Sequence, residues 1–300
     1  MKRLLIINAD DFGYSHTVNV AIQRAHREGI LTSASLMVGE EGFEEAVEMA
    51  REMPALGVGL HLTLTLDTPV LPAKTIPHIV TPQKKLESDP FRAGLRYTFS
   101  KTAQRELFAE MEAQFARFAQ TGLNWSHVDG HQHFHLPPIV WDEMLRLCVQ
   151  YGVRRIRYPY EPILAHLRSG GQSMNLDTIA ALIFRLLRKR NLGSLRRCEQ
   201  KSGQTFFLCD HVYGHLQTGQ MSEAYTLKLL ERLNATTSEV YFHPGANHAH
   251  LLPLEQQTEG VKDVELHALL SPKVLGTLKS GGFQLGNYAQ TEATIKSITQ

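Results

Sequence analysis

Four short stretches of the sequence combine carboxylate and imidazole side chains in patterns that suit metal or acid–base chemistry. They are Asp10 and Asp11 in "NADDFG", His61 in "GVGLHLTLT", the run "HVDGHQHFH" at 127–135, and His243 in "YFHPG". One carboxylate and two imidazoles form a workable ligand set for a catalytic divalent ion, because they leave coordination positions open for water and substrate. We expect one ion, Mg²⁺ or Zn²⁺ first, although this mixed set also accepts Mn²⁺, Co²⁺ or Fe²⁺.

Each stretch also has an ordinary structural explanation. Two carboxylates after a strand often cap a turn, and a single apolar-flanked histidine is more often a hydrogen-bonded core residue. His131, His133 and His135 are harder to explain by packing, because at strand spacing all three side chains would point to one face. A solvated loop is the alternative if the extended conformation ends at Gly130.

The two adjacent aspartates cannot both face the same ion from a regular strand. Neighbouring residues of a strand point to opposite sides unless the chain turns between them. The sequence therefore predicts a division of roles, in which one carboxylate binds the ion and the other transfers protons.

Apolar strand patterns alternate with helical patterns along the chain. The predicted strands cover 4–10, 31–38, 58–66, 127–133, 153–158, 205–209 and 238–243, with a further helix and strand between 272 and 285. Ser15 should cap the first helix and Gly29 should end it. This order favours an α/β fold, an irregular TIM-like (β/α) barrel forming a single domain over 1–300, with a less regular excursion at about 160–203. In such barrels, catalytic side chains gather at the carboxyl ends of the strands.

The composition limits the classes of partner and compartment. The 300-residue chain is 43% hydrophobic, and its 31 Lys and Arg nearly balance its 30 Asp and Glu, so no global field favours nucleic acid. Three widely spaced cysteines without a CxxC pair suit a reducing compartment. The short apolar run after Lys2 and Arg3 is far too short for a signal peptide. We therefore expect a cytoplasmic protein.

Six stretches resemble the YdjC-like carbohydrate deacetylases: "NADDFG", "VGLHLTLT", "SHVDGHQHFH", "YPYEP", "CDHVYGH" and "FHPG", in this order. "GILTSASLMV", "GVGLHLTL", "HFHLPP" and "RYPYEP" are most similar to the hopanoid-biosynthesis-associated HpnK-type members, which often have NAHKHFH where this chain has DGHQHFH. The resemblance implies a distorted βα barrel and metal-dependent hydrolysis of an N-acetyl group from an amino sugar. The substrate it implies is an N-acetylglucosaminyl hopanoid, and the alternative is a chitooligosaccharide or another soluble carbohydrate.

The resemblance also implies roles for individual residues. Matched by motif, Asp11, His61 and His131 would bind the metal, Asp10 would be the base and His243 the acid.

Several nearby residues have weaker assignments. We expect His133 or His135 to hydrogen-bond a metal ligand, with a surface location as the alternative. Arg157 should pair with Asp10, or equally with Glu161. The stretch "CDHVYGH" follows a predicted strand end, so its polar residues should line the sugar pocket, unless they simply begin a loop; they are Asp210, His211 and His215.

The segment 179–197 combines apolar residues with six Arg and Lys. A crossover helix with a solvated basic face is the ordinary interpretation, and peripheral contact with the inner face of a membrane is our hypothesis. Two other function classes stay open: a dinuclear amidohydrolase, suggested by His131 and His133, and a non-catalytic sugar- or lipid-binding protein. The oligomeric state is not predicted, and a dimer is among the alternatives.

Overall fold

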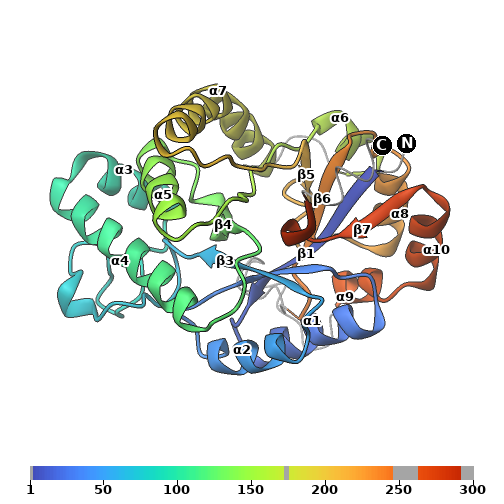
Figure 1. The fold of residues 1–300 in the computed structure, drawn as a ribbon, viewed down its shortest axis with the longest axis horizontal. Helices are drawn as coiled ribbons and strands as arrows, with labels where there is room; N and C mark the ends of the chain where they lie inside the picture. Colours follow the sequence, from blue (N-terminus) through green and yellow to red (C-terminus); the bar gives the residue numbers. More distant parts are fainter. Residues whose placement is uncertain (1–2, 172–175, 246–262, 292–300) are drawn as a thin grey trace.

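The computed structural model describes residues 3–171, 176–245 and 263–291. Within these ranges, seven strands form one sheet in the order β4-β3-β2-β1-β6-β5, and β7 pairs with the first part of β1 (Figure 1). The strands are β1 (Arg3–Phe12), β2 (Ser33–Leu36), β3 (Gly57–Leu62), β4 (Val128–Gly130), β5 (His211–Tyr213), β6 (Thr237–Phe242) and β7 (Phe283–Gly286). Every pairing in the sheet is parallel.

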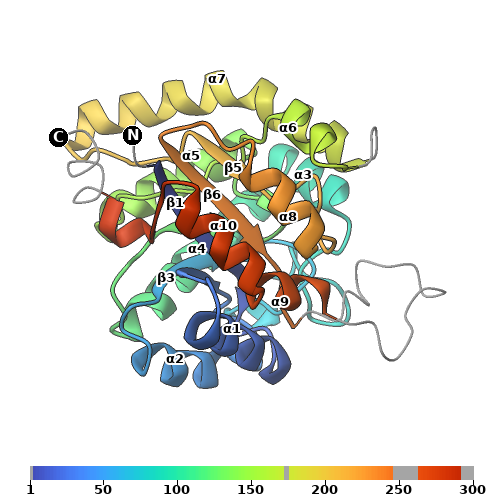
Figure 2. The ribbon, with the colours of Figure 1, turned by 90° about the vertical axis from the view of Figure 1, so that its right-hand side faces the viewer.

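Helices follow the strands along the chain and surround the sheet, as Figures 1 and 2 show. They are α1 (His16–Glu28), α2 (Phe43–Arg51), α3 (Pro90–Phe99), α4 (Lys101–Gln120), α5 (Pro138–Gln150), α6 (Ile163–Arg168), α7 (Leu176–Ser202), α8 (Glu223–Leu230), α9 (Val264–Leu269) and α10 (Pro272–Ser280). The Ser15 side chain caps α1 and Gly29 follows its last turn, as predicted. Parallel strands joined by helices confirm the α/β class, with the strands forming a half-barrel.

Single bridges span the open side of this half-barrel, between β4 and β5. Val128 pairs with Ile156, and Arg155 pairs with Phe207, each through an isolated parallel bridge. The predicted strands at 153–158 and 205–209 are therefore wrong as continuous strands. In the first case only Arg155 and Ile156 pair, each with a different neighbouring segment.

β1 is the central strand and sets the position of the chemistry. All its residues except Arg3 are buried, because helices cover both faces of a parallel sheet. Since all the strands run in the same direction, the carboxyl ends of β1, β3, β4 and β6 lie at the same end of the sheet. The polar stretches of the sequence meet at this end.

The expected excursion at 160–203 contains α6 and the 27-residue α7 rather than strands. α7 packs along α5, where the Trp141 indole donates to the Asn191 carbonyl at 3.0 Å and the Asn191 amide donates to the Leu136 carbonyl at 2.9 Å. These bonds fix α7 above the carboxyl end of β4. Among the described residues, no helix has both the length and the apolar character needed to cross a bilayer.

Candidate active site

A bulge in β1 separates the two adjacent aspartates. The pairing register of β1 with β2 shifts between Ala9 and Phe12, and Asp11 has a φ of 64°. This left-handed conformation is costly for a residue other than glycine and is typical of functional sites. The chain therefore turns between Asp10 and Asp11, which the division of roles requires.

Asp11, His61 and His131 converge at the carboxyl end of the sheet. Their potential ligand atoms all lie within 4.8 Å of one another. The Asp11 carboxylate is 3.4 Å from His61 Nε2 and 3.2 Å from His131 Nδ1. One buried carboxylate and two imidazole nitrogens at this spacing fit a divalent ion that keeps open coordination positions.

Asp129 fixes the ring of His61 from behind. His61 Nδ1 and Asp129 Oδ1 are 2.8 Å apart, which leaves Nε2 facing Asp11. Carboxylate–histidine pairs of this kind orient the imidazoles that bind metals. Burial alone would lower the pKa of His61, but the charge and hydrogen bond of Asp129 overcome it and raise the pKa to about 9. The metal-free His61 is therefore an imidazolium at neutral pH.

Arg157 connects Asp10 to the buried charges beneath the site. Its guanidinium donates to both oxygens of Asp10 at 2.7 Å, lies 2.7 Å from Asp129, and donates to Glu239 at 2.6 and 2.9 Å. The pairing with Asp10 was one of two predicted alternatives. The other partner, Glu161, instead accepts from the backbone of Gly214 and Leu216.

This guanidinium bears on the number of ions that the site can hold. Asp10, His61 and Asp129 form a second group with ligand-like spacing. The Arg157 guanidinium already provides the positive charge between Asp10 and Asp129, so a second cation there would meet strong repulsion. The geometry favours a mononuclear centre over the dinuclear alternative.

His243 lies close to Asp10 and to a second buried carboxylate, Glu265. Its Nε2 is 4.0 Å from Asp10 Oδ2, and its Nδ1 is 3.8 Å from the buried Glu265. Burial would lower the pKa of His243, but the hydrogen bond to Glu265 and the charges of Asp11, Glu265 and Asp10 raise it to about 9. His243 therefore carries a proton at neutral pH in the metal-free protein.

The histidine run at 131–135 does not continue β4, so the predicted strand is wrong beyond Gly130. His131–His133 form a 3₁₀ turn in which Gln132 and His133 have φ angles of 50° and 56°. The expectation that the three histidines share one face is therefore wrong. The alternative of a solvated loop is also wrong, because His133 and His135 are buried.

The turn sends His133 and His135 to different partners. His133 Nε2 is 3.0 Å from the Tyr241 hydroxyl, and its ring packs edge-on against His215, which the structure also places at the cavity. His135 Nε2 is 3.0 Å from the Arg157 carbonyl. Burial lowers the pKa of His135 to about 4, so its neutral ring donates this bond and supports the Arg157 backbone.

Asp210 and His211 lie away from the site, and the expectation that they line the sugar pocket is wrong for both. β5 begins at His211 and pairs it with Ser238, near the start of β6. The two residues therefore lie at the amino end of these strands, opposite the chemistry. Asp210 accepts from the backbone and hydroxyl of Thr237, at the first residue of β6.

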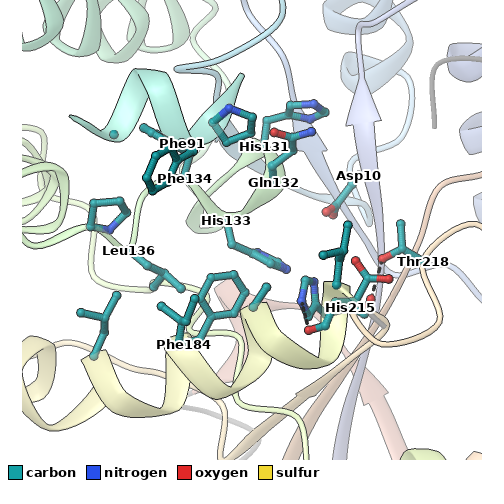
Figure 3. A pocket seen from close by; sticks show the side chains of 18 of the residues that line it. Asp10, Phe91, His131, Gln132, His133, Phe134, Leu136, Phe184, His215 and Thr218 are labelled. Atoms are coloured by element: carbon teal, nitrogen blue, oxygen red, sulfur yellow. Dashed lines mark hydrogen bonds between the residues drawn. The ribbon is translucent and has the colours of Figure 1, made fainter. Parts of the chain in front are cut away.

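The site opens into a cavity of about 770 Å³ with two unlike ends. The polar end contains Asp10, Asp11, His61, His131 and His243; because it includes the candidate metal ligands, we call it the metal end. The other end, which we call the apolar arm, runs between α3 and α7 (Figure 3) and is lined by Phe91, Leu95, Phe134, Leu136, Ile183 and Leu187. A substrate with one polar reacting group and one apolar group would match both ends.

Residues 4–280 match the family described as YdjC-like protein. The chain belongs to this family.

Two curated relatives of this YdjC-like protein are deacetylases by name. A carbohydrate deacetylase of Brevibacillus brevis is 44% identical over 156 residues, which cover 52% of this chain and 59% of that protein. A chitooligosaccharide deacetylase of Salmonella paratyphi B is 34% identical over 158 residues, covering 51% of this chain and 58% of that protein. The chain thus spans less than two thirds of the length of the relatives it matches.

One solved structure supports the fold of the YdjC-like chain. The putative cellobiose-phosphate cleavage protein of Enterococcus faecalis V583 superposes with a TM-score of 0.67 and 24% identity, over 97% of this chain and 99% of that one. At this identity, the likeness concerns the architecture alone.

Several residues of the YdjC-like site were absent from the predicted set. Asp129 lies inside the histidine run, and Glu239 begins the otherwise apolar stretch "EVYF". A charged residue in such a buried segment is a sequence signal that could have identified both as site residues. Asp67, whose carboxylate is 3.6 Å from His131, and Glu265 lie in segments with no local motif. Only the fold brings these two to the site.

Proposed function

We propose that the protein is a metal-dependent N-deacetylase of amino sugars, with residues 1–300 acting as one domain. The observation that carries this proposal is the convergence of Asp11, His61 and His131 within 4.8 Å, beside a cavity that also exposes Asp10 and His243. An amide hydrolase needs ligands for a Lewis acid, a proton acceptor and a proton donor around one open space. The names of the two curated relatives favour the same reaction.

The residues present fit one divalent ion, since His61 presents Nε2 while Asp129 holds its other nitrogen. Such an ion, Mg²⁺ or Zn²⁺ first, with Mn²⁺, Co²⁺ or Fe²⁺ as alternatives, would supply the charge that polarises the amide carbonyl and activates a water molecule. Asp11, His61 and His131 would hold it.

Asp10 and His243 would move the protons of the reaction. Arg157 holds both oxygens of Asp10, which fixes the position of the carboxylate at the cavity wall, where it can accept a proton from the attacking water. His243, whose pKa is raised to about 9, can donate a proton to the sugar nitrogen as the carbon–nitrogen bond breaks. The products are acetate and a free amine.

We further propose an amphiphilic substrate, an N-acetylglucosaminyl hopanoid, as in the HpnK-type branch. The apolar arm supports this choice, because its walls would bury an apolar group attached to the sugar. The enzyme would then act in the cytoplasm, at the inner face of the membrane. A chitooligosaccharide is the second candidate, which the name of the Salmonella relative favours.

The decisive test is acetate release from an N-acetylglucosaminyl hopanoid and from N,N′-diacetylchitobiose, measured side by side after metal replacement. We expect turnover of the hopanoid substrate, and almost none with Asp10→Asn. Turnover of chitobiose alone would refute the hopanoid assignment. No acetate release from either substrate with any of the metals would instead favour a non-catalytic binding protein.

A further inference from the structure

Large apolar side chains are exposed at one place on the described surface. Within residues 3–171, 176–245 and 263–291, the exposed large apolar side chains all belong to α3, α6 and α7. We call this surface the docking face; it comprises Phe91, Leu95, Phe99, Leu164, Leu167, Leu176, Ile179, Leu182, Ile183 and Leu186. A soluble protein rarely leaves such a set exposed without a partner, so the face requires an occupant.

The docking face follows the spacing of helix surfaces. On α3, Phe91, Leu95 and Phe99 recur every four residues, so they form one stripe. On α7, Leu176, Ile179, Leu182, Ile183 and Leu186 recur at steps of three and four residues. Figures 1 and 2 both place α6 and α7 along the same edge of the molecule.

The docking face is continuous with the mouth of the active-site cavity. Phe91 and Leu95 of α3 and Leu176 and Ile183 of α7 are exposed and also line the cavity. The apolar arm therefore opens between the two stripes. Whatever covers the docking face also controls what enters the cavity.

Charge indicates the nature of the occupant. α7 carries seven Lys and Arg against two acidic residues, and Arg185, Lys189, Arg196 and Arg197 are exposed. A helix with exposed apolar residues beside basic ones matches a bilayer that contains anionic lipid. A second copy fits less well, because a two-fold interface would oppose basic α7 to basic α7 and would also close the cavity mouth.

We propose that α3, α6 and α7 dock on an anionic membrane surface and present the apolar arm directly to the bilayer. This inference rests on the proposed lipid-linked substrate and adds the route by which that substrate arrives. The sugar would reach the metal end while its apolar group passes between the stripes without crossing water. The basic residues of α7 would hold the headgroup region.

The test is flotation of the full chain with vesicles of phosphatidylcholine, with and without phosphatidylglycerol. Phe99→Ser combined with Leu186→Ser removes two highly exposed residues that do not line the cavity. The matched control is Glu48→Ser combined with Gln120→Ser, both exposed on α2 and α4. We expect the native chain and the control to float with anionic vesicles, and the apolar variant to bind roughly tenfold more weakly.

Three outcomes would overturn the proposal: no flotation of the native chain, equal flotation of the apolar variant, or a dimer in sedimentation that the same variant abolishes. An unchanged thermal melt of the variant excludes unfolding as the cause of weaker binding. Flotation needs no turnover, so it separates the two proposals. Vesicle binding without acetate release from any substrate would refute the proposed reaction but would still support the docking face as a membrane-binding surface.

Discussion

The two ends of the cavity are built in different ways. The metal end lies at the carboxyl ends of the strands, and its side chains are buried or partly buried and paired with one another, with Arg157 shared among Asp10, Asp129 and Glu239. The apolar arm consists mainly of the facing sides of α3 and α7, with Phe134 and Leu136 between them, and some of its residues are more than 40% exposed, such as Leu95 and Ile183. One end is fixed by charge pairs, whereas the other is shaped by packing alone.

This difference suggests that the metal end determines the reaction and the apolar arm determines which substrates are accepted. Breaking a buried charge pair leaves an uncompensated charge, so the metal end tolerates little change. An apolar wall can change shape at a cost of about 1–3 kcal/mol, because no polar group loses its partner. We therefore expect substitutions at the metal end to affect every substrate, and substitutions in the apolar arm to distinguish substrates.

The largest effect should come from Asp11→Asn. Asparagine tolerates the φ of 64°, so the fold should persist while the only carboxylate of the ligand set is lost. We expect acetate release to fall by about 10³-fold or more on both soluble and lipid-linked substrates. A chelator should produce the same loss, reversed by adding the metal.

Asp142→Asn is the matched control, because Asp142 pairs with Arg190 on the outer surface of α5. It should leave turnover nearly unchanged. Equal activity of Asp11→Asn and Asp142→Asn, at the same metal content, would remove Asp11 from the ligand set.

The sequence predicted which residues meet at the metal end, but it did not predict their backbone conformation. The apolar run before Asp10 predicted a buried strand, and the parallel order of strands predicted that Asp11, His61 and His131 meet at one end; the structure agrees with both. The positive φ angles of Asp11 and Gln132 could not be predicted from the sequence, because the conformation of each residue depends on the strands and loops packed around it.

The errors at Asp210 and His211 have one physical cause. A strand start and a strand end carry similar polar residues, and a short strand such as β5 (His211–Tyr213) has too few residues for the pattern to fix its bounds, which the sequence placed at 205–209. The apolar arm had no sequence signal either, because α3 and α7 are far apart in the chain. Their spatial relation follows from tertiary packing.

The effect of intermediate size is the pH dependence of metal binding, which should release a proton from His61. The pKa of the metal-free His61 is raised to about 9, so near pH 7 a metal must displace one proton from it. Apparent metal affinity should then rise by about tenfold per pH unit and level off above the pKa. The imidazolium stabilises the metal-free fold below the unfolded pKa, and this contribution is lost as the pH rises through about 9.

Calorimetric titration with metal in buffers of different ionisation enthalpy measures this proton release. Asp129→Asn removes the main cause of the raised pKa and should reduce the number of protons released. Metal affinity that does not change with pH would show that His61 is already neutral before binding, or that it is not a ligand.

The smallest effect should come from narrowing the apolar arm with Gly94→Leu. Gly94 lies in α3 and lines the cavity, and a Cβ there would meet only Phe134, at 4.0 Å. The new side chain would occupy space needed by an apolar group, so kcat/KM for the hopanoid substrate should fall by roughly tenfold while that for chitobiose stays the same.

Gly276→Leu in α10 controls for the added side chain, because a Cβ there meets nothing within 4 Å and the residue does not line the cavity. Both variants should match or slightly exceed the native thermal stability, since replacing a helical glycine removes backbone entropy from the unfolded chain. Equal losses on both substrates would mean that the arm shapes the metal end as well, and the contrast between the two ends would fail. A loss confined to the lipid-linked substrate would place substrate selection in the apolar arm, at the α3 wall.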